Sequence, residues 1–169
     1  MISSEKPVST TGDIKEKEPL KIILAEDDKD DQELFIEALH ATKVPSEIIT
    51  VENGQELVNT LKDDSESKPD IVFIDVNMPI KGGKEALAEI KSDQQLKDIP
   101  AVMLSTSNHP RDIDDSFNSG ANLYIQKPNS FAGFILILKK VFFLHWTKVL
   151  INPVKNIFFV SEKNIAHKE

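Results

Sequence analysis

Five side chains that suit phosphoryl chemistry stand where apolar runs of the sequence end. Glu26 and Asp27 follow the first run, Asp75 and Ser105 end two later runs, and Lys127 follows a fourth. Carboxylates without neighbouring His or Cys are typical ligands of a hard cation such as Mg²⁺. A carboxylate beside such a cation can act as a nucleophile, while a lysine and a hydroxyl can bind the oxygens of an incoming phosphoryl group. If the fold brings them together, they indicate Mg²⁺-assisted phosphoryl transfer to Asp75.

The sequence around these side chains alternates between predicted strands and predicted helices. Strands are predicted at residues 20–25, 47–51, 71–74, 101–104 and 123–126. Helices are predicted at residues 30–41, after 53–54, at 84–92, at 111–119 and from Ser130 onward. This order predicts the α/β class, with a doubly wound five-stranded parallel sheet and helices on both faces, as in flavodoxin-like folds. Right-handed crossovers would place all five carboxyl ends, and the candidate side chains, along one edge.

The composition is typical of one globular domain in a reducing compartment. The chain has 169 residues, of which 40% are hydrophobic, and no cysteine, which fits a cytoplasmic protein. The formal net charge of −8 argues against nucleic acid as the main partner. Residues 1–19 are polar without periodicity and are predicted to be a disordered tail. The domain itself is predicted at residues 20–150, followed by a C-terminal tail at 151–169.

No membrane segment is expected from the sequence. The N-terminus lacks the apolar core of a signal peptide. Residues 131–151 are strongly apolar, but charged side chains such as Lys139, Lys140 and Lys148 interrupt them. A spanning helix needs about 20 mostly apolar residues in succession.

The same strand ends carry a resemblance to a known family, the receiver domains of two-component response regulators. The resemblance covers about residues 20–145. Asp75 and Ser105 are 30 positions apart, and Ser105 and Lys127 are 22 apart, as in that family. The motifs that carry it are Ile22-Ile23-Leu24-Ala25-Glu26-Asp27-Asp28, Ile74-Asp75-Val76-Asn77-Met78-Pro79, Met103-Leu104-Ser105-Thr106 and Tyr124-Ile125-Gln126-Lys127-Pro128.

The resemblance implies a role for each matching residue. Asp75 would accept a phosphoryl group from the phosphohistidine of a sensor histidine kinase or of a phosphotransfer protein. Ser105 and Lys127 would bind that group, and Tyr124 would be the switch aromatic that turns inward when Ser105 moves toward the phosphate. The Mg²⁺ ligands would be Glu26, Asp27, Asp75 and the backbone carbonyl of Asn77.

The length and the Phe-Leu-His-Trp stretch at residues 143–146 resemble the stand-alone receivers that partner phytochrome-type sensor kinases. About 39 residues follow Ser130, which is too few for a separate DNA-binding domain. The resemblance therefore implies a signalling protein that is not an enzyme in the ordinary sense and whose output is a protein contact.

Three other classes of protein are alternatives. A haloacid-dehalogenase-like phosphatase also uses an Asp nucleophile with Mg²⁺, but it needs a second acid two residues later, where this chain has Asn77. An interaction module without phosphorylation is disfavoured by the complete set of site residues. A nucleotide-binding Rossmann domain would need a Gly-rich loop after the first strand, and none is present.

The last predicted helix has more apolar side chains than one buried face requires. Its sheet-facing stripe is predicted to be Phe131, Phe134, Ile135, Leu138, Phe142 and His145. An apolar surplus then remains exposed, made of Leu136, Ile137, Phe143, Leu144 and Trp146. We predict a homodimer through this helix and the edge of the fifth strand. The alternative is that residues 151–160 fold back and cover the surplus within one molecule.

Overall fold

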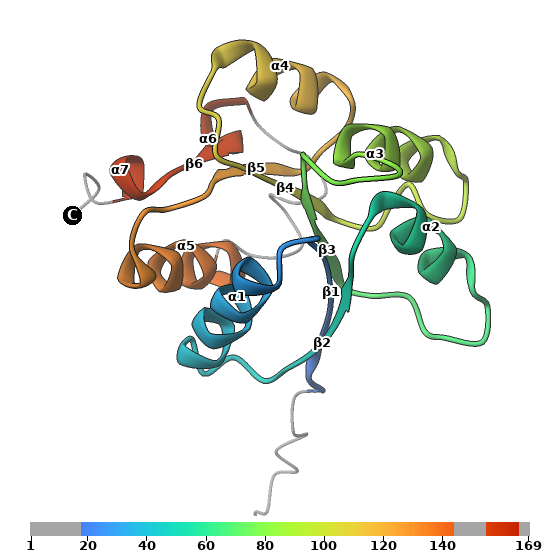
Figure 1. The fold of residues 1–169 in the computed structure, drawn as a ribbon, viewed down its shortest axis with the longest axis horizontal. Coiled ribbons are helices and arrows are strands. Elements are labelled where there is room, and N and C mark those ends of the chain that lie inside the picture. The colour runs from blue at the N-terminus through green and yellow to red at the C-terminus, as the bar shows by residue number, and fades with distance from the viewer. Residues whose placement is uncertain (1–17, 144–154, 166–169) are drawn as a thin grey trace, which may run out of the picture.

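The computed structural model describes residues 18–143 and 155–165 and has the predicted α/β architecture, with helices on both faces of a parallel sheet (Figure 1). The strands lie in the order β2-β1-β3-β4-β5-β6 and every neighbouring pair is parallel. They are β1 (Leu20–Ala25), β2 (Ser46–Val51), β3 (Ile71–Asp75), β4 (Ala101–Ser105), β5 (Leu123–Gln126) and β6 (Phe159–Val160). The helices are α1 (Lys29–Ala41), α2 (Gly54–Lys62), α3 (Gly83–Ser92), α4 (Pro110–Asn118), α5 (Phe131–Phe143), α6 (Lys155–Phe158) and α7 (Glu162–Ile165).

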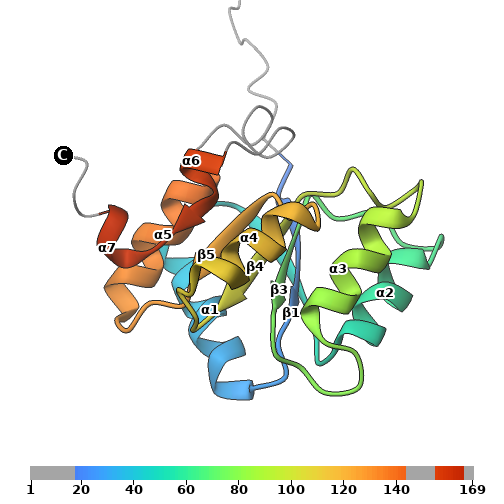
Figure 2. The same ribbon diagram turned by 90° about the horizontal axis from the view of Figure 1, so that it is seen from above.

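The sheet is covered on both faces, which explains why its central strand shows no polar alternation. Phe73 of β3 faces α1 and α5 and meets Phe35 of α1 edge-on at 4.9 Å between ring centroids. The alternate residues Val72 and Ile74 lie in the other apolar cluster, which α2 and α3 complete. Figure 2 shows α1 and α5 on one side of the sheet and α2 and α3 on the other. A strand buried on both faces needs apolar side chains in both directions.

Local sequence signals set the loops that hold the site. Asp28 caps α1 by accepting a hydrogen bond from the Asp31 N–H at 3.0 Å. At the start of α3, a Cβ on Gly83 would lie 2.1 Å from the carbonyl oxygen of Asp75. Only glycine allows this approach, so α3 begins directly against the carboxyl end of β3.

Helix α5 is rotated relative to the predicted stripe. Its buried residues are Gly133, Phe134, Ile137, Leu138 and Val141, so the prediction is right for Phe134 and Leu138 but wrong for Phe131, which is 43% exposed. Ile137, predicted to be exposed, is buried. The reason is that α5 packs on two sides, because Gly133 also lies against Glu162 of α7. Leu136 and Phe143 are exposed as predicted, whereas Leu144, His145 and Trp146 lie outside the described residues.

The sheet has six strands where five were predicted. Part of the predicted C-terminal tail returns to the sheet, and β6 pairs with β5 through Tyr124–Phe159 and Ile125–Val160. An edge strand has unpaired N–H and C=O groups, and the apolar run at 157–160 supplies a partner for them. The edge of β5 is therefore covered by the same chain, so its predicted use in a homodimer is wrong.

Among residues 18–143 and 155–165, the helices are all too short or too polar to cross a bilayer.

Candidate functional site

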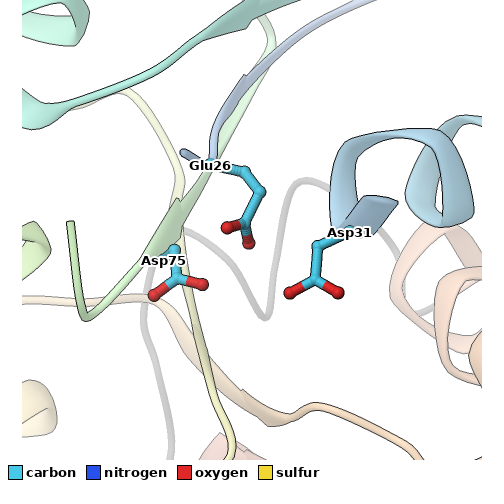
Figure 3. A group of neighbouring side chains, drawn as sticks. All are labelled: Glu26, Asp31 and Asp75. Carbon is cyan, nitrogen blue, oxygen red and sulfur yellow. The ribbon is translucent and has the colours of Figure 1, made fainter. Parts of the chain in front are cut away.

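The predicted residues Glu26, Asp27, Asp75, Asn77 and Lys127 come together at the carboxyl edge of the sheet, in a hollow of about 240 Å³. Ser105 lines a second hollow beside it, which shares Asn77 and Thr106 with the first. Asp75 ends β3 and Glu26 follows β1, and both carboxyl groups are buried. Figure 3 shows these two carboxyl groups and that of Asp31 pointing toward a common centre. The hollow is lined by Glu26, Asp27, Asp28, Asp31, Asp75, Asn77, Thr106 and Lys127.

Lys127 binds three carboxylates at once. Its ammonium group lies 2.9 Å from Glu26 Oε2 and 2.9 Å from Asp31 Oδ2, and it also contacts Asp75 Oδ2. The backbone supports this position, because the Lys127 N–H donates to the Ser105 carbonyl at 2.7 Å. With one positive charge facing three carboxylates, the site keeps an excess of negative charge.

Asp31 was not among the residues that the sequence singled out. It lies in the first turn of α1, where an acidic residue usually stabilises the helix by interacting with the helix dipole. In the fold, however, carboxylate oxygens of Glu26, Asp31 and Asp75 lie within 4.8 Å of one another. One sequence feature could have indicated Asp31. It lies about one helical turn after Asp28, the N-cap of α1, and α1 begins close to the carboxyl edge of the sheet.

Asp27 and Asn77 lie around this group. Asp27 is exposed and lines the hollow, but it is not part of the cluster of three. The Asn77 N–H donates to Asp75 Oδ1 at 2.7 Å, so one oxygen of Asp75 accepts this bond while the other contacts Lys127. The Asp75 carboxylate is therefore held in one orientation.

Ser105 and Tyr124 are joined through the backbone of Ser107. The Ser107 N–H donates to Ser105 Oγ at 3.1 Å, and the Tyr124 hydroxyl donates to the Ser107 carbonyl at 2.9 Å. Both Ser105 and Tyr124 are buried. The aromatic side chain predicted to be a switch thus lies inward, bonded to the loop that follows Ser105.

The charges in the hollow change two pKa values. Burial raises the pKa of the Glu26 carboxyl to about 7, and the neighbouring Asp75 adds to the rise, while Lys127 opposes it. Burial by itself would lower the pKa of Lys127, but its bonds to Asp75, Glu26 and Asp31 outweigh that effect and raise it above its ordinary value. Glu26 therefore lies close to its titration point at neutral pH.

The donor set fits a hard divalent cation. Oxygen ligands that belong to close carboxylates, two of them buried, are what Mg²⁺ and Mn²⁺ bind. A cation here would offset the unbalanced negative charge and favour the ionised form of Glu26.

Comparisons with known proteins identify the family. The receiver domain model of response regulators matches residues 22–139. The response regulator Rcp1 of Synechocystis sp. is 36% identical over 113 residues, which are 64% of this chain and 77% of Rcp1. The phosphorylated cyanobacterial phytochrome response regulator RcpA is 41% identical, with a TM-score of 0.68, over 75% of this chain and 95% of RcpA. For the Mn²⁺-bound form of Rcp1 the identity is 31% and the TM-score 0.67, over 75% of this chain and 96% of Rcp1.

The chain therefore belongs to the response regulator receiver domain family. Its fold is of the CheY type, and RcpA, one of its relatives, is described as a cyanobacterial phytochrome response regulator. Receiver domains are signalling proteins rather than classical enzymes, and they bind divalent metal ions.

Proposed function

We propose that this protein is a stand-alone response regulator that accepts a phosphoryl group on Asp75 from the phosphohistidine of a sensor histidine kinase. One observation carries the proposal: Asp75 ends a buried strand with its carboxylate oriented by the Asn77 N–H and by Lys127. The similarity to RcpA, described as a phosphorylated phytochrome response regulator, supports a phytochrome-type kinase as the donor.

The residues of the site suit each part of this transfer. A carboxylate oxygen of Asp75 attacks phosphorus, the bond from phosphorus to the donor imidazole breaks, and the imidazole recovers a proton from solvent. Lys127 meets the negative oxygens of the transferred group, and the Ser105 hydroxyl donates to another of them. Because Lys127 is shared with Glu26 and Asp31, it must turn partly toward the phosphoryl group when that group arrives.

Glu26 and Asp75 would hold Mg²⁺, with Asp31 or Asp27 as the further carboxylate and the Asn77 backbone carbonyl as an additional ligand. The ion would neutralise charge that develops on the transferred group. The Mn²⁺-bound form of Rcp1 supports a divalent ion in this relative.

The phosphatase alternative lacks the second acidic residue that it requires. Such an enzyme places a second acid two residues after its nucleophile. Here that position is Asn77, whose backbone N–H binds the Asp75 carboxylate. Transfer of one phosphoryl group to Asp75, rather than steady turnover of phosphate esters, is the behaviour that this site supports.

The test is mass spectrometry after incubation with acetyl phosphate and Mg²⁺. The wild-type chain should gain one phosphoryl group, and Asp75→Asn should gain none. Asp64→Asn is the matched control, because that carboxylate is 91% exposed in the loop after α2 and should leave labelling unchanged. Full labelling of Asp75→Asn would reject Asp75 as the acceptor.

A further inference from the structure

Residues 155–165, which we call the C-terminal strap, cover the edge of the sheet that β5 would otherwise form. The strap consists of α6, β6 and α7, and Figure 1 shows β6 beside β5, between α4 and α5. Its strand β6 continues the sheet beyond β5. The side chain of Phe159 packs against Tyr124 with ring centroids 6.1 Å apart. The strap thus covers the residue that is bonded to the loop after Ser105.

The strap also supports α4. Phe158 is buried and meets Phe117 of α4 edge-on, with ring centroids 5.1 Å apart. Lys155 forms an ion pair with Asp114 of α4 at 3.2 Å. These two contacts connect α4 to the strap.

Its other end is anchored on α5. Glu162 accepts hydrogen bonds from the Ser130 hydroxyl and from the Asn129 N–H. The Glu162 carboxylate fits against α5 because residue 133 is a glycine. A Cβ on Gly133 would lie 2.5 Å from this carboxylate. The strap therefore occupies a surface whose shape matches it at both ends.

Helix α4 packs on the core through Ile113 and Phe117, and both of these side chains are only partly buried. Ser116 is its single fully buried residue, and the Ser116 hydroxyl is the one buried side-chain group within residues 18–143 and 155–165 that has no hydrogen-bond partner. At its start, Asp112 accepts a bond from the Ser107 hydroxyl at 2.7 Å and pairs with Lys84 of α3. An element with few buried contacts is easily displaced, so the position of α4 depends on Ser107 at one end and on the strap at the other.

Ser107 connects these contacts to the acceptor site. Its N–H binds a lone pair of Ser105 Oγ and leaves the Ser105 hydroxyl hydrogen available to a phosphoryl oxygen on Asp75. Its carbonyl accepts from Tyr124, and Tyr124 is covered by Phe159. The docked strap therefore stabilises the loop conformation in which Ser105 can donate.

We propose that the C-terminal strap is the element that senses the state of Asp75: its docking on α4, β5 and α5 is coupled to phosphorylation through Ser105, Ser107 and Tyr124. The inference rests on the proposed phosphorylation of Asp75. Docking favours the phosphorylated form, and because coupling between two equilibria is reciprocal, phosphorylation must tighten docking by the same factor. The state of the strap then determines how far the surface formed by α4 and β5 is available to a partner.

The experiment measures amide hydrogen exchange of residues 155–165 in the full-length chain, with Mg²⁺ and with or without beryllofluoride as the phosphoryl mimic. Fluorine NMR of bound fluoride shows whether the mimic occupies the site. We expect the mimic to slow exchange in the strap by at least about fivefold, the lower end of ordinary allosteric couplings. Lys163→Ala, on the exposed side of α7, is the control and should show the same slowing.

Two variants separate coupling from simple packing. Tyr124→Phe keeps the ring against Phe159 but removes the bond to Ser107. In this variant the strap should stay docked, while the mimic should no longer slow its exchange. Phe159→Ala should loosen the strap and also lower the rate of labelling by acetyl phosphate.

The possible results bear on different parts of the proposal. No bound fluoride and no labelling in the wild-type chain would reject the proposed function, and the inference with it. Bound mimic with unchanged exchange in residues 155–165 would reject the inference alone. Equal slowing in wild type and Tyr124→Phe would reject the route through Tyr124.

Discussion

Asp31 and Lys127, which are 96 residues apart in the chain, form an ion pair of 2.9 Å within the candidate metal site. The pair joins the first turn of α1 to the end of β5. Asp31 is absent from the predicted ligand set. Through this pair it shares the positive charge of Lys127, the lysine that contacts Asp75. Asp31 is 45% exposed and Glu26 is 3% exposed in their side chains, so the more accessible of these two carboxylates is the easier one to redirect toward a cation.

The first prediction concerns the carboxylates that we propose to hold the cation. Asp31→Asn should weaken Mg²⁺ binding about tenfold, because removing a charge some 4 Å from a divalent ion costs on the order of 1 kcal/mol or more in this partly solvated site. Asp27→Asn, at the exposed rim, should have the smaller effect if Asp31 is the ligand and the larger if Asp27 is. A Mg²⁺ titration of each variant, monitored by NMR, decides between the two carboxylates. Equal affinities of both variants and wild type would show that neither carboxylate holds the ion.

The second prediction follows from the raised pKa of Glu26. This pKa is about 7 in the fold against an ordinary value of 4.5, so the folded state binds more protons than the unfolded state between these values. The free energy of unfolding should then decrease as pH rises from 4.5 to 7, by about 2–3 kcal/mol for this group without metal. Mg²⁺ affinity should rise over the same interval, because the ion competes with the proton.

Urea unfolding at a series of pH values tests this dependence, and Glu26→Gln is the matched control. The substitution should remove the decrease that Glu26 causes and leave the contributions of other groups. If the variant and the wild-type chain show the same pH dependence, Glu26 does not titrate in this range.

The third prediction concerns Lys127. Lys127→Ala should still bind Mg²⁺, and it should be destabilised by about 1–3 kcal/mol in metal-free buffer, because three close carboxylates lose their shared cation. Mg²⁺ should therefore raise the melting temperature of this variant more than that of the wild-type chain. Lys29→Ala removes an exposed ion pair with Glu52 outside the cluster and serves as the control. An identical response of all three proteins to Mg²⁺ would contradict the shared role of Lys127.

The fourth prediction uses two adjacent glycines. Gly83→Ala should lower the free energy of unfolding by about 1–3 kcal/mol, because its Cβ would lie 2.1 Å from the Asp75 carbonyl and push α3 from β3. Gly82→Ala should change it by less than about 0.5 kcal/mol, since the nearest atom to its Cβ is 3.6 Å away. Denaturant unfolding of both variants measures the difference. Similar losses in both would mean that the close approach at Gly83 is unimportant.

The fifth prediction is the homodimer. Because β6 covers the edge of β5, the contact between the two copies would have to form through α5. Phe143 is 84% exposed and Leu136 is 52% exposed. We expect light scattering at tens of micromolar to give a dimeric mass, and Phe143→Glu to shift it toward the monomer. A monomeric mass for both proteins would reject the dimer and leave the fold-back alternative.

Much of the site could be predicted because its residues are tied to strand ends. Asp75, Ser105 and Lys127 each follow or end a buried apolar run, and a parallel sheet brings such ends together whatever the details of packing. Glu26 was found for the same reason. Asp31 was not, because it belongs to a helix, where an acid in the first turn has an ordinary local explanation.

The α/β class and the edge at which the charged side chains meet could be predicted from the sequence alone. Both follow from local apolar runs and from the handedness of crossovers, which do not depend on exact packing. The family was indicated by the resemblance of the motifs around Asp75, Ser105 and Lys127 and is shown by the receiver domain match. The tertiary structure decided the sharing of Lys127 among three carboxylates, the rotation of α5 and the return of residues 155–165 to the edge of β5. Each of these depends on contacts between residues far apart in the chain, such as Gly133 with Glu162, and no local pattern records which distant partner an apolar or charged side chain will meet.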